Sequence, residues 1–198
     1  MATIMNHLDP DTGRTRSFLP DLGHVVQFYT RDEYLLNGLA ATLGGALEAG
    51  ESVVVVMTTP HYKGLLKRLS SRGIDMADAT KRGQFTFLDA ADTLKRFMSA
   101  KGPDRHRFQW EIGSVLRKAE LAAEVKHKRV VVFGEMVAVL WRQNKQDAAI
   151  RLEQLWNELA KTHFFHLHCA YPAKWFKGKN GGAPYATICG EHSVVIPA

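Results

Sequence analysis

The sequence predicts an α/β fold, a three-layer α/β/α sandwich built on a mainly parallel sheet. Strand-like apolar runs recur along the chain with helical patterns between them, and the run at residues 52–57 is apolar and β-branched almost throughout. Such a run is typical of a strand covered on both faces. Parallel strands need crossover connections, and right-handed crossovers place helices over both faces of the sheet.

Five segments have the composition and length of strands. The predicted strands cover residues 24–29, 52–57, 84–88, 129–133 and 164–171. Helices are predicted between them, because apolar residues recur there with a period close to that of the α-helix. The predicted helices cover residues 35–47, 59–72, 90–100, 104–119 and 145–162.

Helix boundaries agree with this division of the chain. Gly50 ends the first helix just before a strand, and Gly73 ends the second. Thr58 or Thr59 is suited to cap the second helix, with Pro60 near its first position. The alternating order of strands and helices therefore predicts a single layered sheet.

A chain of 198 residues with 45% apolar composition is long enough for one substantial core. We expect a loosely ordered leader at residues 1–22 and a single domain at residues 23–198. No apolar run approaches the roughly 20 residues of a membrane span. The two cysteines form no CxxC pair and no disulfide framework, which favours a reducing cytoplasm.

The net charge of +6 favours acidic partners, which include nucleic acid, an anionic membrane surface and an acidic protein. The basic run at residues 126–129 suggests a nucleic-acid-binding accessory protein as one alternative function. No recognition motif accompanies this run, however, and such runs are usually solvated surface. We therefore expect no specific nucleic-acid partner.

In an open parallel sheet, ligands bind beyond the carboxyl ends of the strands. A phosphate-binding loop after the second strand would read GxxxxGK[ST], but residues 57–64 lack its glycines, and Pro60 offers no N–H. Lys63 is followed by glycine instead of a hydroxyl residue. We therefore expect no ATP hydrolysis, although a helix N-terminus behind Thr58 would suit a weakly bound anion. An ordinary helix cap is the simpler explanation of this segment.

Glu135 follows an apolar strand, which would place its carboxylate at the ligand-binding edge of the sheet. Met136 and Trp141 would flank it with soft and aromatic surface. A carboxylate in an apolar cavity needs a partner such as His61 or a ligand cation. Capping of the next helix is the alternative role of Glu135.

Further candidate ligand-binding residues come from other elements. They are His24, Phe28 and Tyr29 of the first strand, Thr58 and His61 after the second, Glu153 and Trp156 of the last predicted helix, and Tyr171 of the last strand. Glu153 lies at the border of an apolar stripe, and both a structural and a ligand-binding role are open. Together these residues offer aromatic surface with a few polar groups, which is the composition of a small-molecule site.

His166 and His168 point to one face of a strand, and imidazole is a common zinc ligand. No third ligand follows from the spacing, so we assign no metal site and expect histidines on a partly exposed face. Cys169 faces the other way, which argues against a Cys/His pair within this strand. We expect it to be a buried, inert cysteine.

Five ordered segments resemble the MEDS family, the sensory domain named for methanogens, methylotrophs and the regulator DcmR. They are residues 24–29, 50–56, 133–137 with Leu140 and Trp141, 152–157 and 169–172. Residues 188–197 also resemble the usual end of the family. His166 and His168 depart from the pattern, which has apolar or small residues there.

The resemblance implies a fold related to the RecA/KaiC ATPases with a degraded phosphate loop. It also implies sensing of small organic compounds in signal transduction or transcriptional control. With no DNA-binding or kinase segment attached, the output would pass to a separate signalling or regulatory protein or through self-association. An enzyme using Glu135 or the histidines is the remaining alternative, but no acid and base are paired at recognisable spacing. We therefore predict a sensory module that has no catalytic residues and no cofactor.

Overall fold

The computed structural model describes residues 7–8, 15–16, 23–124, 129–176 and 182–198. Most of the expected leader lies outside these residues, as do residues 126–128 of the basic run. Two short segments of the leader, β1 (His7–Leu8) and β2 (Thr15–Arg16), pair antiparallel with each other.

The centre of the molecule is a six-stranded sheet with the order β10-β3-β9-β8-β4-β5, in which every neighbouring pair is parallel. Its strands are β3 (His24–Tyr29), β4 (Ser52–Met57), β5 (Phe85–Asp89), β8 (Val130–Gly134), β9 (Phe165–Pro172) and β10 (Val194–Ile196). All residues of β4 are buried, as expected for a parallel strand between two neighbours and two helical layers.

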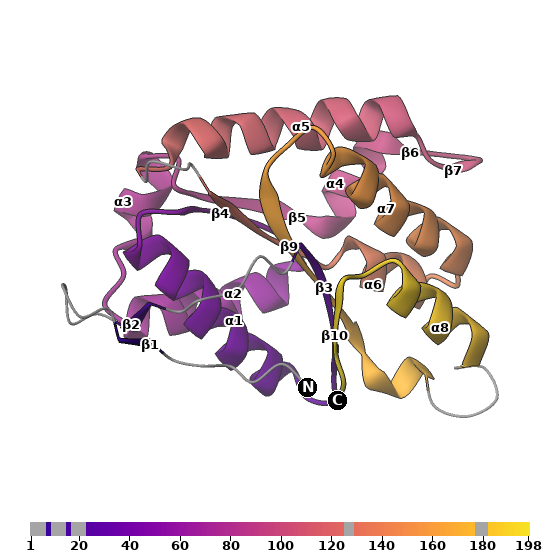
Figure 1. Cartoon of the computed structure of the whole chain (residues 1–198), viewed down its shortest axis with the longest axis horizontal. Coiled ribbons are helices and arrows are strands. Elements are labelled where there is room, and N and C mark those ends of the chain that lie inside the picture. The colour runs from indigo at the N-terminus through magenta and orange to yellow at the C-terminus, as the bar shows by residue number, and fades with distance from the viewer. Residues whose placement is uncertain (1–6, 9–14, 17–22, 125–128, 177–181) are drawn as a thin grey trace.

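One face of the sheet is covered by α1 (Asp32–Glu48), α2 (Thr59–Ser71) and α3 (Met76–Lys81). Leu35, Leu39 and Leu43 of α1 pack here against alternate residues of the central strands. Figure 1 shows α1 and α2 together on this side, well separated from α5 and α7. Alternation along the strands therefore divides the core into two layers.

The other face is covered by five helices. They are α4 (Ala90–Phe97), α5 (Arg105–Ala122), α6 (Met136–Arg142), α7 (Gln146–Leu159) and α8 (Gly182–Gly190). Phe108 and Trp156 meet edge to face at the centre of this layer, with ring centroids 5.1 Å apart. The α/β/α sandwich expected from the sequence is confirmed.

The five predicted strands are present within one residue of their expected bounds, and three of the helices were not predicted. The helices α3, α6 and α8 are short and have no long apolar stripe that would mark them in the sequence. The helix expected to reach residue 100 ends at Phe97, because the chain turns into a hairpin of β6 (Met98–Ser99) and β7 (Gly102–Pro103). Gly102 has φ +101° in this hairpin, a conformation that favours glycine.

Within the described part of the chain, none of the helices combines the length and the apolar character that crossing a membrane requires.

Candidate functional site

Four of the predicted ligand-binding residues meet at the carboxyl ends of β3, β4 and β8. Glu135 Oε2 accepts hydrogen bonds from the Thr58 backbone N at 2.8 Å and from Thr58 Oγ1 at 3.1 Å. His61 Nδ1 lies 2.7 Å from Glu135 Oε1, which confirms His61 as the partner of this carboxylate. The ring of Tyr29 stands 6.4 Å from that of His61, and His61 Nε2 is 3.3 Å from Asp32 Oδ2.

This arrangement fills the place where a helix N-terminus would bind an external anion. Thr58 is the N-cap residue of α2, one of the two positions expected, but its hydroxyl donates to Glu135 and makes no capping hydrogen bond to the helix. Glu135 is 5% exposed and also makes no cap hydrogen bond to α6. Its carboxylate instead binds across to the neighbouring strand end.

The same contacts shift two pKa values. The hydrogen bond to Glu135 raises the pKa of His61 and outweighs the opposing effect of burial. Burial raises the pKa of Tyr29, and the negative charge of Glu135 adds to this effect. His61 therefore favours its charged form beside Glu135, whereas Tyr29 stays neutral.

A second set of predicted residues packs as an aromatic group. Trp141 contacts Phe176 with ring centroids 5.0 Å apart, and Phe28 contacts Tyr185 at 4.6 Å. Tyr171 stands edge-on to Trp141 at 5.8 Å. Met136 is fully buried in the same core layer.

Two more predicted residues, His24 and Glu153, lie in a buried polar group together with Cys169 and His192. We call these four residues the Glu153 cluster. Glu153 Oε2 lies 3.3 Å from His24 Nε2 and accepts a hydrogen bond from Cys169 Sγ at 3.3 Å. His24 Nε2 is 3.5 Å from Cys169 Sγ. His192 Nε2 is 3.5 Å from Glu153 Oε1, which also accepts a hydrogen bond from Tyr171 OH at 2.8 Å.

The cluster is deeply buried. Glu153 and Cys169 are 0% exposed, and the side chain of His192 is also 0% exposed. Burial alone would raise the pKa of Glu153, but its contacts with His192 and His24 reverse the effect and hold this pKa well below its usual range. Burial likewise opposes the charged form of His192, yet the contact with Glu153 raises the pKa of His192. Burial and the charge of Glu153 raise the pKa of both Cys169 and Tyr171.

Beside this cluster lies a cavity of about 340 Å³, which we call the α7 pocket. It is lined by Gly23, His24, Trp156, Asn157, Ala160, Phe165, Leu167, Glu191 and Ser193. His24 belongs to both the cluster and the pocket, and Asn157 Oδ1 lies 2.9 Å from His24 Nδ1. The pocket and the cluster therefore share His24 and lie next to each other.

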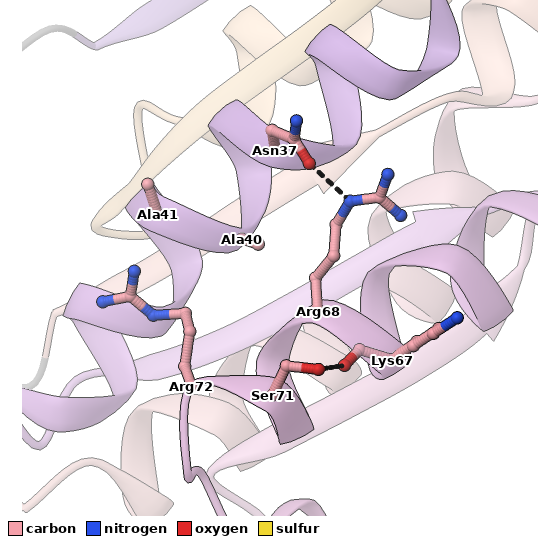
Figure 2. A pocket seen from close by; sticks show the side chains of 7 residues that line it. All are labelled: Asn37, Ala40, Ala41, Lys67, Arg68, Ser71 and Arg72. Carbon is pink, nitrogen blue, oxygen red and sulfur yellow. Dashed lines mark hydrogen bonds between the residues drawn. The ribbon is translucent and has the colours of Figure 1, made fainter.

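A second hollow, of about 420 Å³, is a surface groove between α1 and α2. Figure 2 shows Arg68 and Arg72 extending from the α2 side toward Asn37 and two alanines of α1, with Lys67 and Ser71 also lining the groove on the α2 side. Arg68 Nε donates to Asn37 Oδ1 at 2.6 Å, and Arg72 pairs with Glu48 at 3.3 Å. This groove contains none of the residues predicted to bind a ligand.

Sequence reasoning missed the residues that complete the cluster and the pocket. Cys169 was placed correctly on the face opposite His166 and His168, but its neighbours on that face come from other elements. His192 and Asn157 have no local pattern that marks them. Strand alternation, which puts Cys169 and Tyr171 on one face, was the available clue.

The expectation that His166 and His168 lie on a partly exposed face holds for His168, whose exposure is intermediate, but not for His166. His166 is 8% exposed, and the ring of His168 packs edge-on against Phe133 at 5.6 Å. Burial, together with the charges of the nearby His192 and His24, lowers the pKa of His168 to about 4.

Three comparisons with known proteins add to this geometry. A KaiC-like protein from the hyperthermophilic archaeon Pyrococcus horikoshii has a similar structure, with a TM-score of 0.53 and 16% identity over 89% of this chain and 72% of that one. Among curated proteins, no match is found. The sequence profile of the sensory domain called MEDS, for methanogen/methylotroph, DcmR, matches residues 23–180. The chain belongs to the MEDS family.

Proposed function

We propose that this chain is a sensory domain that binds a small organic molecule in the α7 pocket and passes the event to a separate signalling or regulatory protein. Membership of a sensory family supports the role, and the α7 pocket is the observation that supports the binding site. Transcriptional control and a cytoplasmic location are parts of the same proposal.

The lining of the α7 pocket suits a small, mostly apolar ligand. Trp156, Phe165 and Leu167 supply aromatic and aliphatic walls, while His24 and Asn157 supply polar groups at one end. Its volume of about 340 Å³ lies near the lower end of the range for small-molecule sites. The combination of apolar walls with a few fixed polar groups favours a compact organic compound that carries one or two polar atoms.

The pocket is also connected to an edge of the sheet. Asn157 Nδ2 donates to the backbone O of Glu191 at 2.9 Å, and Ser193 N donates to His24 O at 2.8 Å. These contacts hold the segment that leads into β10, which is the edge strand beside β3. A ligand that competes for Asn157 or Glu191 would therefore bias the position of this edge, where a partner chain has access to backbone groups.

The proposal is tested by filling the pocket without touching its polar groups. Ala160 lines the α7 pocket and is exposed, so Ala160→Phe should block the cavity with little effect on folding. We expect small organic compounds that raise the melting temperature of the wild type to bind Ala160→Phe at least about tenfold more weakly. A thermal-shift screen followed by calorimetric titration of the hits measures this change.

Ala41→Phe is the matched control, because Ala41 is an exposed alanine that lines the α1–α2 groove instead. It should bind the same compounds as tightly as the wild type does. The proposal would be abandoned if compounds bound Ala160→Phe unchanged, or if only Ala41→Phe lost them.

A further inference from the structure

The Glu153 cluster joins four segments that are far apart in the sequence. His24 begins β3, Glu153 lies on α7, Cys169 lies in β9 and His192 lies in the turn between α8 and β10. One side-chain N, O or S atom from each lies within 4.8 Å of the others. What occupies the centre of this group depends on which of these atoms carry hydrogens.

The hydrogen of His24 is fixed by its neighbour Asn157. The amide nitrogen of Asn157 donates to the backbone O of Glu191 at 2.9 Å and to Glu191 Oε2 at 3.2 Å, so its oxygen is the atom that faces His24. An amide oxygen only accepts, and His24 Nδ1 at 2.9 Å must therefore be the donor. Neutral His24 then presents an unprotonated Nε2 to Glu153 and Cys169.

The ring of His192 is fixed in the same way. Its Nδ1 lies 2.6 Å from the backbone O of Ile188, which can only accept a hydrogen bond. Neutral His192 therefore presents an unprotonated Nε2 to the cluster. This buried nitrogen has no hydrogen-bond partner of good geometry, although Glu153 Oε1 is 3.5 Å away.

With both rings neutral, the centre of the cluster is rich in lone pairs and poor in hydrogens. Two ring nitrogens and a carboxylate converge on it, and the thiol of Cys169 is the only group among the four that brings its own hydrogen. Tyr171 OH donates from outside to the other oxygen of Glu153. Lone pairs that face one another in a buried site need a positive charge between them, and either a proton on His192 or a metal ion supplies it.

The distances fit a tetrahedral metal ion. Zinc bound to nitrogen, oxygen and sulfur at its usual bond lengths separates neighbouring ligand atoms by about 3.3–3.6 Å. Glu153 Oε2 lies 3.3 Å from both His24 Nε2 and Cys169 Sγ, and these last two atoms are 3.5 Å apart. Three ligand atoms thus already form one face of such a tetrahedron, and His192 Nε2 stands beside it as the fourth.

The charges of the ligands and the orientation of the two histidine rings also favour zinc. A thiolate and a carboxylate carry one negative charge each, which the two positive charges of zinc cancel inside a buried site. Histidines that bind metals almost always donate their other ring N–H to a carbonyl or carboxylate oxygen. Asn157 and Ile188 provide these acceptors for His24 and His192.

We propose that His24 Nε2, Glu153, Cys169 Sγ and His192 Nε2 bind a zinc ion that ties the turn before β10 to α7 and the centre of the sheet. Binding releases the thiol proton of Cys169 to solvent and involves no change of oxidation state. The metal site shares His24 with the α7 pocket, but its test needs no organic ligand.

The test uses the full chain, stripped with a chelator and titrated with cobalt(II) or zinc. Wild type should take up about one equivalent of either metal per chain, and cobalt should give the absorption of a tetrahedral ion together with a thiolate-to-cobalt charge-transfer band. Metal content is checked by elemental analysis. Zinc should also raise the melting temperature, because it binds the folded state.

Variants locate the site without relying on the loss of a buried residue. The chain has two cysteines, so a charge-transfer band that survives in Cys189→Ala must come from Cys169. His192→Gln should weaken cobalt binding at least about tenfold, whereas His106→Gln, an exposed histidine on α5, should not change it.

Each outcome decides the proposal. It is overturned if folded wild type binds no stoichiometric cobalt or zinc, because a protonated His192 then balances Glu153 without a metal. It is also overturned if the bound cobalt shows no thiolate band, if Cys189→Ala abolishes that band, or if His106→Gln weakens binding as much as His192→Gln does.

Discussion

The carboxylate of Glu135 occupies the position at the N-terminus of α2 where an external anion would bind. It accepts hydrogen bonds from the backbone and hydroxyl of Thr58 and lies against His61, so the positive end of that helix already has a negative partner. This single side chain closes the place that a phosphate would need.

His61 gives this arrangement a dependence on pH. Its pKa is raised in the folded protein by the hydrogen bond to Glu135, so the charged ring stabilises the fold below its unfolded pKa of about 6.5. That stabilisation is lost as the pH rises through the folded pKa. His61→Gln should therefore lower the free energy of unfolding more at about pH 6 than at about pH 9.

Chemical denaturation at the two pH values measures this difference, with His106→Gln as the control for an exposed histidine. A gap between wild type and His61→Gln that stayed constant, or widened toward alkaline pH, would contradict the role given to His61.

The residues of the turn between β4 and α2 determine whether a nucleotide can bind there. A nucleotide-binding turn needs consecutive backbone N–H groups and a lysine that reaches the outer phosphate. Here Pro60 lies in the first turn of α2, and the N–H of Thr58 is already bonded to Glu135. The fold resembles that of a KaiC-like protein, but this element does not have the residues of a phosphate cradle.

We therefore expect no micromolar binding of ATP with magnesium and no ATP hydrolysis. Calorimetric titration and a phosphate-release assay measure both. Glu135→Gln should behave like the wild type, because removing the charge of Glu135 restores neither the missing glycines nor the hydroxyl residue that would follow the lysine. Magnesium-dependent micromolar binding by the wild type would refute this prediction, and binding gained in Glu135→Gln would show that repulsion alone had excluded the nucleotide.

At the scale of the whole molecule, the chain carries a net charge of +6. Several cations are paired with acids, such as Arg105 with Glu158 at 2.8 Å and Lys95 with Asp92 at 2.7 Å. Lys67 of the α1–α2 groove adds to the remaining positive surface. Diffuse charge of this kind attracts polyanions without selecting among them.

DNA binding should accordingly be weak, independent of sequence and lost as salt rises toward physiological concentration. Fluorescence anisotropy over a salt series measures this dependence. Lys67→Gln and Lys118→Gln, which neutralise exposed lysines on α2 and α5, should weaken binding to a similar extent. Selective binding at physiological salt, or an effect confined to Lys67→Gln, would point instead to a defined site in the groove.

The sequence by itself determined the layers of this protein. Residues 52–57 could only be a doubly covered strand, and the apolar spacing of residues 145–162 fixed the helix that became α7. These patterns are local, because they repeat with the period of one element. The pairing of Glu135 with His61 was also predictable, since both follow strand ends that meet at one edge of a parallel sheet.

Only the tertiary structure decided which side chains surround Glu153. His24 and Cys169 are 145 residues apart in the sequence, and His24 and Asn157 are 133 apart. They meet because β3 lies beside β9 and α7 packs against both strands. This arrangement depends on how the whole sheet packs. Apolar periodicity reports which face of an element is buried, but it does not report which partner that face will meet.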